Sequence, residues 1–423
     1  MFIKKIQKTF SSQFLRNAGW LGLAELANRI FRLGTTVTLA RMFSPKDYGL
    51  MAIVYIVVEF SSLFTLDRGV IAKIVQADEE DLDIICNTSY WINWILCISV
   101  LFIQCIASFP IAYFYGNKNL ILPICAVGLV YLIFPIFLVQ GALIERENRL
   151  KIKAIGNVAQ SFLGNYITII LAIAGMGVWS IVAAMVLSNL IWIFIYYHNC
   201  SWRPPKSLKL EKWQDITNFG KNVIAVEFLT RLRMNLDYLI VGIFLGIGEL
   251  GLYYFAFNAG SGITMNIVKT LISPLFSHLC GVRKSYHKFR ERYFNSVKTI
   301  ATIIVPIVLI QASAAPFYVP IIFGDKWTNA VPILILICLS VIPRAFKQSS
   351  SLLLNAIDKT HIVFYYDLLY TLVFGISLLA TVNMGIFWVA VAVLSSHLIM
   401  SAIFNIWADN YVFSKNKKMF NKS

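Results

Sequence analysis

Seven basic residues lie inside stretches of the 423-residue chain that are otherwise apolar, and they are the first candidates for chemistry. A charge within a membrane-spanning helix costs several kcal/mol unless it faces water or a partner, so each is a functional hypothesis. Arginine and lysine at such positions suit an anionic ligand, and the arginine fork matches phosphate oxygens. The predicted substrate-binding residues are Arg29, Arg32, Arg231, Lys269, Arg344 and Lys347.

Two of these arginines follow an acid at helical spacing. Glu25 precedes Arg29 by four residues, and Glu227 precedes Arg231 by four, so each pair lies on one helix face. The pairs either neutralise themselves as structural ion pairs or belong to a polar cavity, and the sequence leaves both interpretations open. The seventh cation, Arg233, points away from the face of Arg231, and we expect it to pair with Asp237 between helices.

The other four cations have no acid nearby in the sequence. Arg32, Lys269, Arg344 and Lys347 are therefore expected to leave surplus positive charge within the membrane. Glu25, Glu227 and Asp367 are the acids that we expect to face a cavity or to carry a coupling ion. The sequence does not decide between proton and sodium coupling.

Motifs for covalent chemistry are absent from the sequence. It contains no G-x-x-x-x-G-K-[ST] loop, no C-x-x-C pair and no H-E-x-x-H metal motif. We predict no catalytic residue, no metal site and no cofactor, and so a protein that is not an enzyme. The seven cysteines are expected to act as small apolar side chains.

The elements that must position these charges are membrane helices. The chain is 58% hydrophobic and 14% charged, with a mean hydropathy of +0.71, whereas soluble domains are about 45–50% apolar and about 25% charged. This composition excludes a soluble enzyme and predicts an all-α polytopic membrane protein. Twelve candidate helices are predicted at 16–40, 48–66, 84–113, 119–143, 154–174, 178–198, 222–246, 250–276, 297–322, 329–354, 362–382 and 386–409.

The net charge of +16 indicates how the chain is oriented in the membrane, and it does not indicate nucleic-acid binding. With both termini in the cytoplasm, 26 of the 37 Lys and Arg residues lie on the cytoplasmic side, four lie outside and seven lie within spans. This bias predicts an N-in, C-in topology and attraction to anionic lipids. The outer loops are short, which argues against a membrane-embedded glycosyltransferase or polymerase.

The sequence repeats itself at an offset near 208 residues. Gly175-Met176-Gly177-Val178-Trp179 matches Asn383-Met384-Gly385-Ile386-Phe387, and Tyr115-Gly116-Asn117 matches Phe323-Gly324-Asp325. Six spans per copy is an even number, so both copies enter the membrane from the same side. We predict two parallel six-helix lobes, at 1–198 and 222–423, joined by a cytoplasmic linker at 199–221. A binding site between such lobes would open to either side as they rock.

Several segments resemble the bacterial polysaccharide transporters of the Wzx type, which are flippases for lipid-linked oligosaccharides of O-antigen, capsule and colanic acid. The segment from Ala40 to Leu50, ARMFSPKDYGL, is similar to the family signature AR-x-L-x-P-x-D-Y-G, with Phe43 in place of leucine. Further matches are Asp67-Arg68-Gly69, Gly141-Ala142-Leu143 with Glu145-Arg146-Glu147, Gly177-Val178-Trp179-Ser180, Trp202-Arg203-Pro204, Asn235 to Gly242 and Phe323-Gly324-Asp325-Lys326-Trp327.

The resemblance implies a V-shaped, MATE-like bundle in the bacterial inner membrane. It also implies a flippase that moves undecaprenyl-diphosphate-linked oligosaccharide outward for surface polysaccharide synthesis, beside a polymerase and chain-length complex. A cation-coupled multidrug exporter shares this superfamily, but its mostly cationic substrates favour an acidic cavity. Surplus cations favour the flippase, with Arg29, Arg32 and Arg231 holding the diphosphate.

Overall fold

The computed structural model describes residues 28, 31–204, 210–211, 213–283 and 285–415 of the chain. Every regular element within these ranges is a helix. Nine helical segments of this part are long and apolar enough to cross a membrane. They are Pro45–Gln76, Glu79–Phe114, Lys118–Arg146, Leu150–Ile173, Val178–Asn199, Tyr286–Phe323, Asp325–Ala356, Thr360–Met384 and Ile386–Ser414. The all-helical, multi-pass membrane fold predicted from composition is confirmed.

Three of the twelve predicted spans are not among these nine. The span at 16–40 lies mostly outside the described residues. The span at 222–246 falls in α10 (Trp213–Leu245). This helix is continuous, but its charged residues, which include Glu227, Arg231, Arg233 and Asp237, lower its hydropathy. The span at 250–276 is divided into α11 (Ile247–Phe257), a π-helical turn at Asn258–Gly262 and α12 (Ile263–Ile272).

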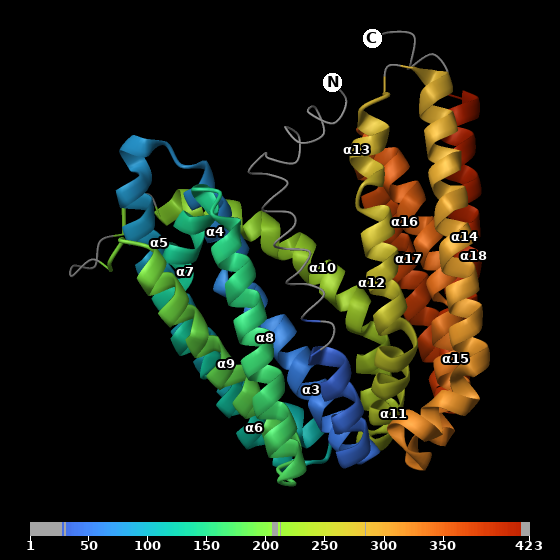
Figure 1. Cartoon of the computed structure of the whole chain (residues 1–423), viewed down its shortest axis with the longest axis horizontal. Helices are drawn as coiled ribbons and strands as arrows, with labels where there is room; N and C mark the ends of the chain where they lie inside the picture. Colours follow the sequence, from blue (N-terminus) through green and yellow to red (C-terminus); the bar gives the residue numbers. More distant parts are fainter. Residues whose placement is uncertain (1–27, 29–30, 205–209, 212, 284, 416–423) are drawn as a thin grey trace, which may run out of the picture. The chain divides into compact units, whose positions relative to one another are not determined.

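The chain packs into two compact units, Met1–Asn235 and Leu236–Ser423, and α10 crosses from one to the other. Before α10, the first unit contains a helix at 31–42, followed by α3 (Pro45–Ser61), α4 (Asp67–Gln76), α5 (Leu82–Phe114), α6 (Ile121–Val127), α7 (Val130–Arg146), α8 (Leu150–Ile173) and α9 (Val178–Asn199) (Figure 1). Its core joins α4, α5 and α7 around Val70, Ile74 and Val139, which are fully buried.

The Ser-Pro-x-Asp part of the signature segment has a local structural role. Ser44 is the N-cap of α3: its hydroxyl accepts a hydrogen bond from the amide of Asp47 at 3.2 Å, and the Asp47 carboxylate accepts one from the amide of Ser44 at 2.9 Å. Pro45 occupies the first helical position, where no backbone donor is needed. These residues therefore fix the start of the helix.

The second unit consists, after α10, of α11, α12, α13 (Leu275–Cys280), α14 (Tyr286–Tyr318), α15 (Val331–Leu339), α16 (Val341–Ala356), α17 (Thr360–Thr381) and α18 (Ile386–Asn410). One cluster packs α12 and α14 against α15 and α16 through Val268, Val308 and Cys338, which are fully buried. A second cluster packs α13, α14, α16 and α18 together.

The second unit repeats the order of helices of the first. α5 and α14 each have 33 residues and a proline near the C-terminal end, Pro110 and Pro316. The helix that follows is broken in both units, between α6 and α7 and between α15 and α16. Gly116 and Gly324, which the sequence pairs at an offset of 208, have φ angles of 61° and 104°. Only glycine adopts such angles without strain, so the two loops share a backbone requirement.

Burial divides the helices of each unit in the same way. In the most apolar stretches of α8 and α17, 17% of the residues are buried, against 56% for both Pro45–Gln76 and Asp325–Ala356. α8 and α17 thus lie at the edge of their units, where α8 packs mainly on α9 and α17 mainly on α18 (Figure 1).

Candidate functional site: a polar network at a broken helix

The second membrane segment of the first unit is broken between α3 and α4. A 3₁₀ turn at Ser62–Thr65 follows α3, and Leu66 has a left-handed backbone with φ 54° and ψ 20°. Such a break leaves backbone carbonyl groups without helical donors, and side chains from other helices must replace them. The carboxamide of the buried Asn93 in α5 donates to the Thr65 carbonyl at 2.8 Å, which holds the break in place.

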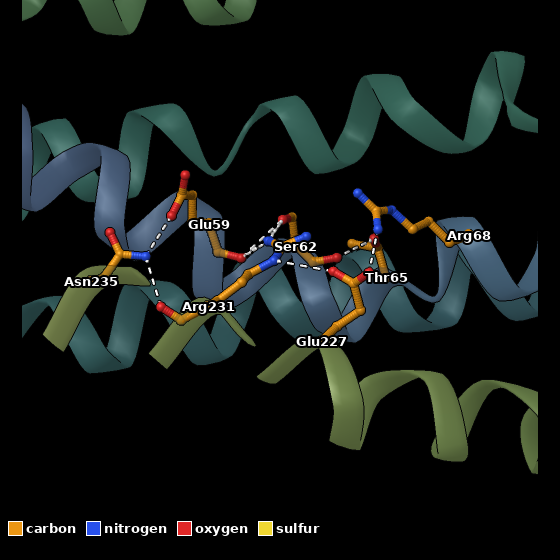
Figure 2. A network of polar contacts seen from close by, with 7 residues as sticks. All are labelled: Glu59, Ser62, Thr65, Arg68, Glu227, Arg231 and Asn235. Carbon is orange, nitrogen blue, oxygen red and sulfur yellow. Dashed lines mark hydrogen bonds and ion pairs between the residues drawn. The ribbon is translucent and has the colours of Figure 1, made fainter. Parts of the chain in front are cut away.

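Arg231 of α10 supplies a second donor to this region. Its Nη1 donates to the backbone carbonyl of Glu59 and, at 2.8 Å, to Oγ of Ser62, and its Nε lies 3.7 Å from Oε2 of Glu227 (Figure 2). The i, i+4 pair predicted between Glu227 and Arg231 is confirmed. The guanidinium also ties α10 to the end of α3, and this contact was not visible in the sequence.

Two further contacts extend the network along α10. Asn235, one turn beyond Arg231, donates from Nδ2 to Oε2 of Glu59 at 2.8 Å. At the other end, Glu227 also forms an ion pair with Arg68 of α4 (Figure 2). The Arg68 side chain is 65% exposed, whereas those of Glu227 and Arg231 are 24% and 21% exposed. The network therefore runs from a half-buried interior to an open end at Arg68.

The charge and size of this site limit what it binds. Three carboxylates, those of Glu59, Asp67 and Glu227, stand against two arginines, Arg68 and Arg231, so the cations here are already balanced. The recess lined by Asp67, Arg68, Glu227 and Arg231 has a volume of about 20 Å³, which is room for about one water molecule. In this conformation the network connects helices, and the recess itself is too small to enclose a diphosphate.

The remaining predicted residues of the first unit precede α3 in the chain. Glu25 and Arg29 are outside the described residues. Arg32 is exposed and forms no ion pair with any residue of the described ranges. One turn further on, Thr35 donates to Oδ1 of Asn165 in α8 at 2.5 Å, so the polar face of the helix before α3 packs on α8.

In the second unit, one expectation is wrong. Lys347 of α16 forms an ion pair with Asp367 of α17, and the side chains are 21% and 23% exposed. Lys347 is therefore not a surplus cation. The two residues are 20 positions apart, and only the packing of α16 on α17 joins them. Asp367, predicted as a coupling acid, is a partner in this pair.

The other two cations of the second unit, Lys269 and Arg344, form no ion pair in the described part of the chain. The guanidinium of Arg344 lies 5.7 Å from the ring centre of Phe257, and Lys269 is exposed. Asp237, which the sequence pairs with Arg233, accepts hydrogen bonds from the Tyr253 hydroxyl at 2.7 Å and from the amide of Tyr238 at 3.0 Å.

One polar pair was not predicted from the sequence. The Tyr370 hydroxyl of α17 lies 2.7 Å from Nδ1 of His397 in α18. In the first unit, Gln160 of α8 donates to Asn189 of α9 at 3.1 Å. His397 follows Asn189 by the repeat offset of 208 residues, so the repeat itself contained the signal. The same helix contact is made by neutral amides in one unit and by titratable groups in the other.

Comparisons with known proteins give the chain relatives along nearly its whole length. It is 23% identical over 425 aligned positions to the teichuronic acid biosynthesis protein TuaB of Bacillus subtilis (strain 168), covering 98% of this chain and 86% of that protein. It is also 23% identical to the lipopolysaccharide biosynthesis protein WzxC of Escherichia coli (strain K12), covering 85% of this chain and 73% of that protein.

Among solved structures, the lipid II flippase MurJ in an inward closed conformation has a similar fold. The TM-score is 0.75 at 12% sequence identity, and the match covers 95% of this chain and 91% of MurJ. This likeness concerns the fold. The family model described as polysaccharide biosynthesis protein matches residues 38–332, well over half of the sequence. The chain therefore belongs to the polysaccharide biosynthesis protein family.

Proposed function

We propose that the protein is a flippase that moves undecaprenyl-diphosphate-linked oligosaccharide from the cytoplasmic to the outer leaflet of the bacterial inner membrane. The observation that carries this proposal is the family match over residues 38–332. The similarity to TuaB and WzxC, whose names place them in surface-polysaccharide synthesis, and the MurJ-like fold support it. The step is transport without covalent chemistry, and so the protein is not an enzyme.

The proposed organisation follows the sequence repeat. Six helices in each lobe, at 1–198 and 222–423, move relative to each other about the linker at 199–221, with both termini in the cytoplasm. The repeated helix lengths and the paired glycines Gly116 and Gly324 support a duplication. Alternating access then carries the sugar chain while the lipid tail stays in the bilayer. Delivery to a polymerase and chain-length complex belongs to the same proposal.

The predicted cations divide into two groups by their partners. Arg231 and Lys347 have acidic partners, Glu227 and Asp367, and are assigned to holding helices in position. Arg32, Lys269 and Arg344 form no ion pair within the described ranges and are the proposed diphosphate contacts, together with Arg29. Glu25, Glu227 and Asp367 remain the proposed acids for ion coupling. A phosphate gains most from a guanidinium that no carboxylate already occupies.

A reconstituted assay tests this proposal. Purified protein in liposomes is given undecaprenyl-diphosphate-linked oligosaccharide in one leaflet, and a membrane-impermeant lectin detects the sugar that reaches the other. Wild-type protein should speed the appearance of the sugar, and Arg32→Gln and Arg344→Gln should slow it at least about tenfold each, from the loss of a charge-assisted contact. Arg203→Gln is the matched control, because Arg203 is an exposed arginine bound to the carbonyls of Cys200 and Trp202.

Two results would contradict the proposal. In one result, liposomes that contain wild-type protein flip the lipid-linked glycan no faster than protein-free liposomes, but transport cationic dyes when a proton or sodium gradient is applied. The protein is then a drug exporter. If the glycan is flipped equally by wild type, Arg29→Ala, Arg32→Gln and Arg344→Gln, the site assignment fails while the flippase function stands.

A further inference from the structure

A groove unrelated to the network at α3 lies in the second unit, between α12–α13 and the first turns of α14. It has a volume of about 350 Å³, within the range of about 300–1,000 Å³ that is typical of small-molecule sites. One end is lined mainly by apolar side chains, Leu271, Leu275 and Ile300, beside Thr299. The other end is lined by polar side chains, His278, Arg292 and Asn295, and Ser296 lies between the two ends.

Pro274 creates this groove. It has no amide hydrogen and cannot continue the helical hydrogen bonding, so α12 ends at Ile272 and α13 begins at Leu275. The short α13 then lies beside α14 (Figure 1). Nη1 of Arg292 in α14 donates to the backbone carbonyl of His278 in α13 at 3.3 Å, so the guanidinium stands at the polar mouth of the groove.

The mouth carries a net positive charge. Arg292 forms no ion pair within the described ranges, whereas Arg283, at the start of the same region, pairs with Asp358. Lys288 and Arg290 add two further exposed cations to the first turns of α14, against Glu291. An anion is therefore attracted to this end of α14.

The two ends of the groove fit the two parts of a lipid. α14 lies within a candidate membrane span, Tyr286–Phe323, and Arg292 is close to its start. Ile300 is eight residues further along, which is about 12 Å at 1.5 Å per residue. That distance separates a headgroup phosphate from the upper part of an acyl chain. A soluble anion would leave the apolar end without a partner.

We propose that this groove binds an anionic phospholipid of the membrane, with its phosphate on Arg292 and an acyl chain along Leu271, Leu275 and Ile300. The site lies wholly within the second unit and does not depend on the flippase proposal. Removing one cation beside an anionic lipid weakens binding about fivefold, and removing a direct phosphate contact about tenfold or more.

Native mass spectrometry of the full-length protein in detergent tests the site. Wild type is titrated with phosphatidylglycerol, with phosphatidylcholine of the same chains, and with phosphatidylglycerol in the presence of excess inorganic phosphate. Wild type should bind phosphatidylglycerol saturably and in preference to phosphatidylcholine, and inorganic phosphate should not compete. Arg292→Gln should weaken binding about 5- to 10-fold. Arg290→Gln is the matched control, since Arg290 lies 5.6 Å from the ring centre of Phe294 rather than in the groove.

Three outcomes would overturn the proposal. Equal weakening by Arg290→Gln and Arg292→Gln would reduce the effect to general surface charge. Equal binding of both lipids would remove the role of the headgroup, and full competition by inorganic phosphate would indicate a site for soluble anions. If Arg292→Gln does not fold, Leu271→Trp, which fills the groove and keeps every charge, decides: lost binding supports the site, and retained binding overturns it.

Discussion

Replacing Gly156 by alanine is expected to force apart two helices that define the edge of the first unit. A Cβ atom at Gly156 in α8 would lie 2.1, 2.6 and 2.8 Å from Cζ3, Cη2 and Cε3 of Trp192 in α9. Carbon atoms in contact prefer about 3.5–4.0 Å. Trp192 has little room to retreat, because it is 8% exposed and its ring centre lies 4.9 Å from that of Tyr196 and 6.3 Å from that of Phe137.

The magnitude follows from a comparison within one helix. Gly164 lies two turns further along α8, and a Cβ there would meet Ser188 at 3.4 Å, an ordinary contact. Alanine gains about 0.5–1 kcal/mol over glycine in a helix at either position, so this gain cancels between Gly156→Ala and Gly164→Ala. The remaining difference is the cost of overpacking, about 1–3 kcal/mol. For a domain of about 150–250 residues this corresponds to a Tm difference of about 2–12 °C.

Thermal unfolding of the purified protein in detergent, followed by fluorescence-detected size exclusion after heating, measures both variants against wild type. Gly164→Ala should unfold at or slightly above the wild-type temperature, and Gly156→Ala clearly below it. If the two variants have equal Tm values, or if Gly156→Ala is the more stable, then α8 and α9 do not approach as closely as described. The reasoning about glycine at this interface would then be refuted.

Three further predictions use the same unfolding assay. Asn93→Ala leaves the buried Thr65 carbonyl without its donor and should cost about 1–3 kcal/mol. Lys347→Met and Asp367→Asn should each destabilise the second unit by leaving one charge unpaired, and the double variant should recover most of the loss; additive losses would exclude the ion pair. Arg146→Lys should cost about 1.5–3 kcal/mol, because only the fork of Arg146 reaches the carbonyls of Ile74 and Val75 and the Glu79 carboxylate together; wild-type stability would exclude that role.

The sequence predicted what depends on local pattern. Apolar runs predicted the helical membrane fold, and the i, i+4 spacing predicted the pair of Glu227 with Arg231. The repeat paired Gly116 with Gly324, and both have positive φ angles in the structure. Each of these features is decided within a few residues of chain. The signature segment also has a local explanation, since Ser44 and Asp47 cap one helix.

Contacts between helices could not be predicted from the sequence. The pair of Lys347 with Asp367 and the contact of Arg231 with the Glu59 carbonyl join residues that are 20 and 172 positions apart. Their partners are selected by how helices pack, and a backbone carbonyl carries no residue-specific signal at all. For this reason the sequence did not predict which of the cations pair with an acid.

Leu66 at the break between α3 and α4 is a suitable position for a fluorescent label that follows the shape of this helix. A leucine with φ 54° costs about 1–2 kcal/mol more than glycine would, yet its side chain is 8% exposed within the cluster of Val70, Ile74 and Val139. The strained residue is thus also an anchor, and any movement that straightens this helix must withdraw the Leu66 side chain from its apolar surroundings. In a variant whose seven native cysteines are replaced, an environment-sensitive fluorophore attached to cysteine at position 66 would change its emission as the helix straightens.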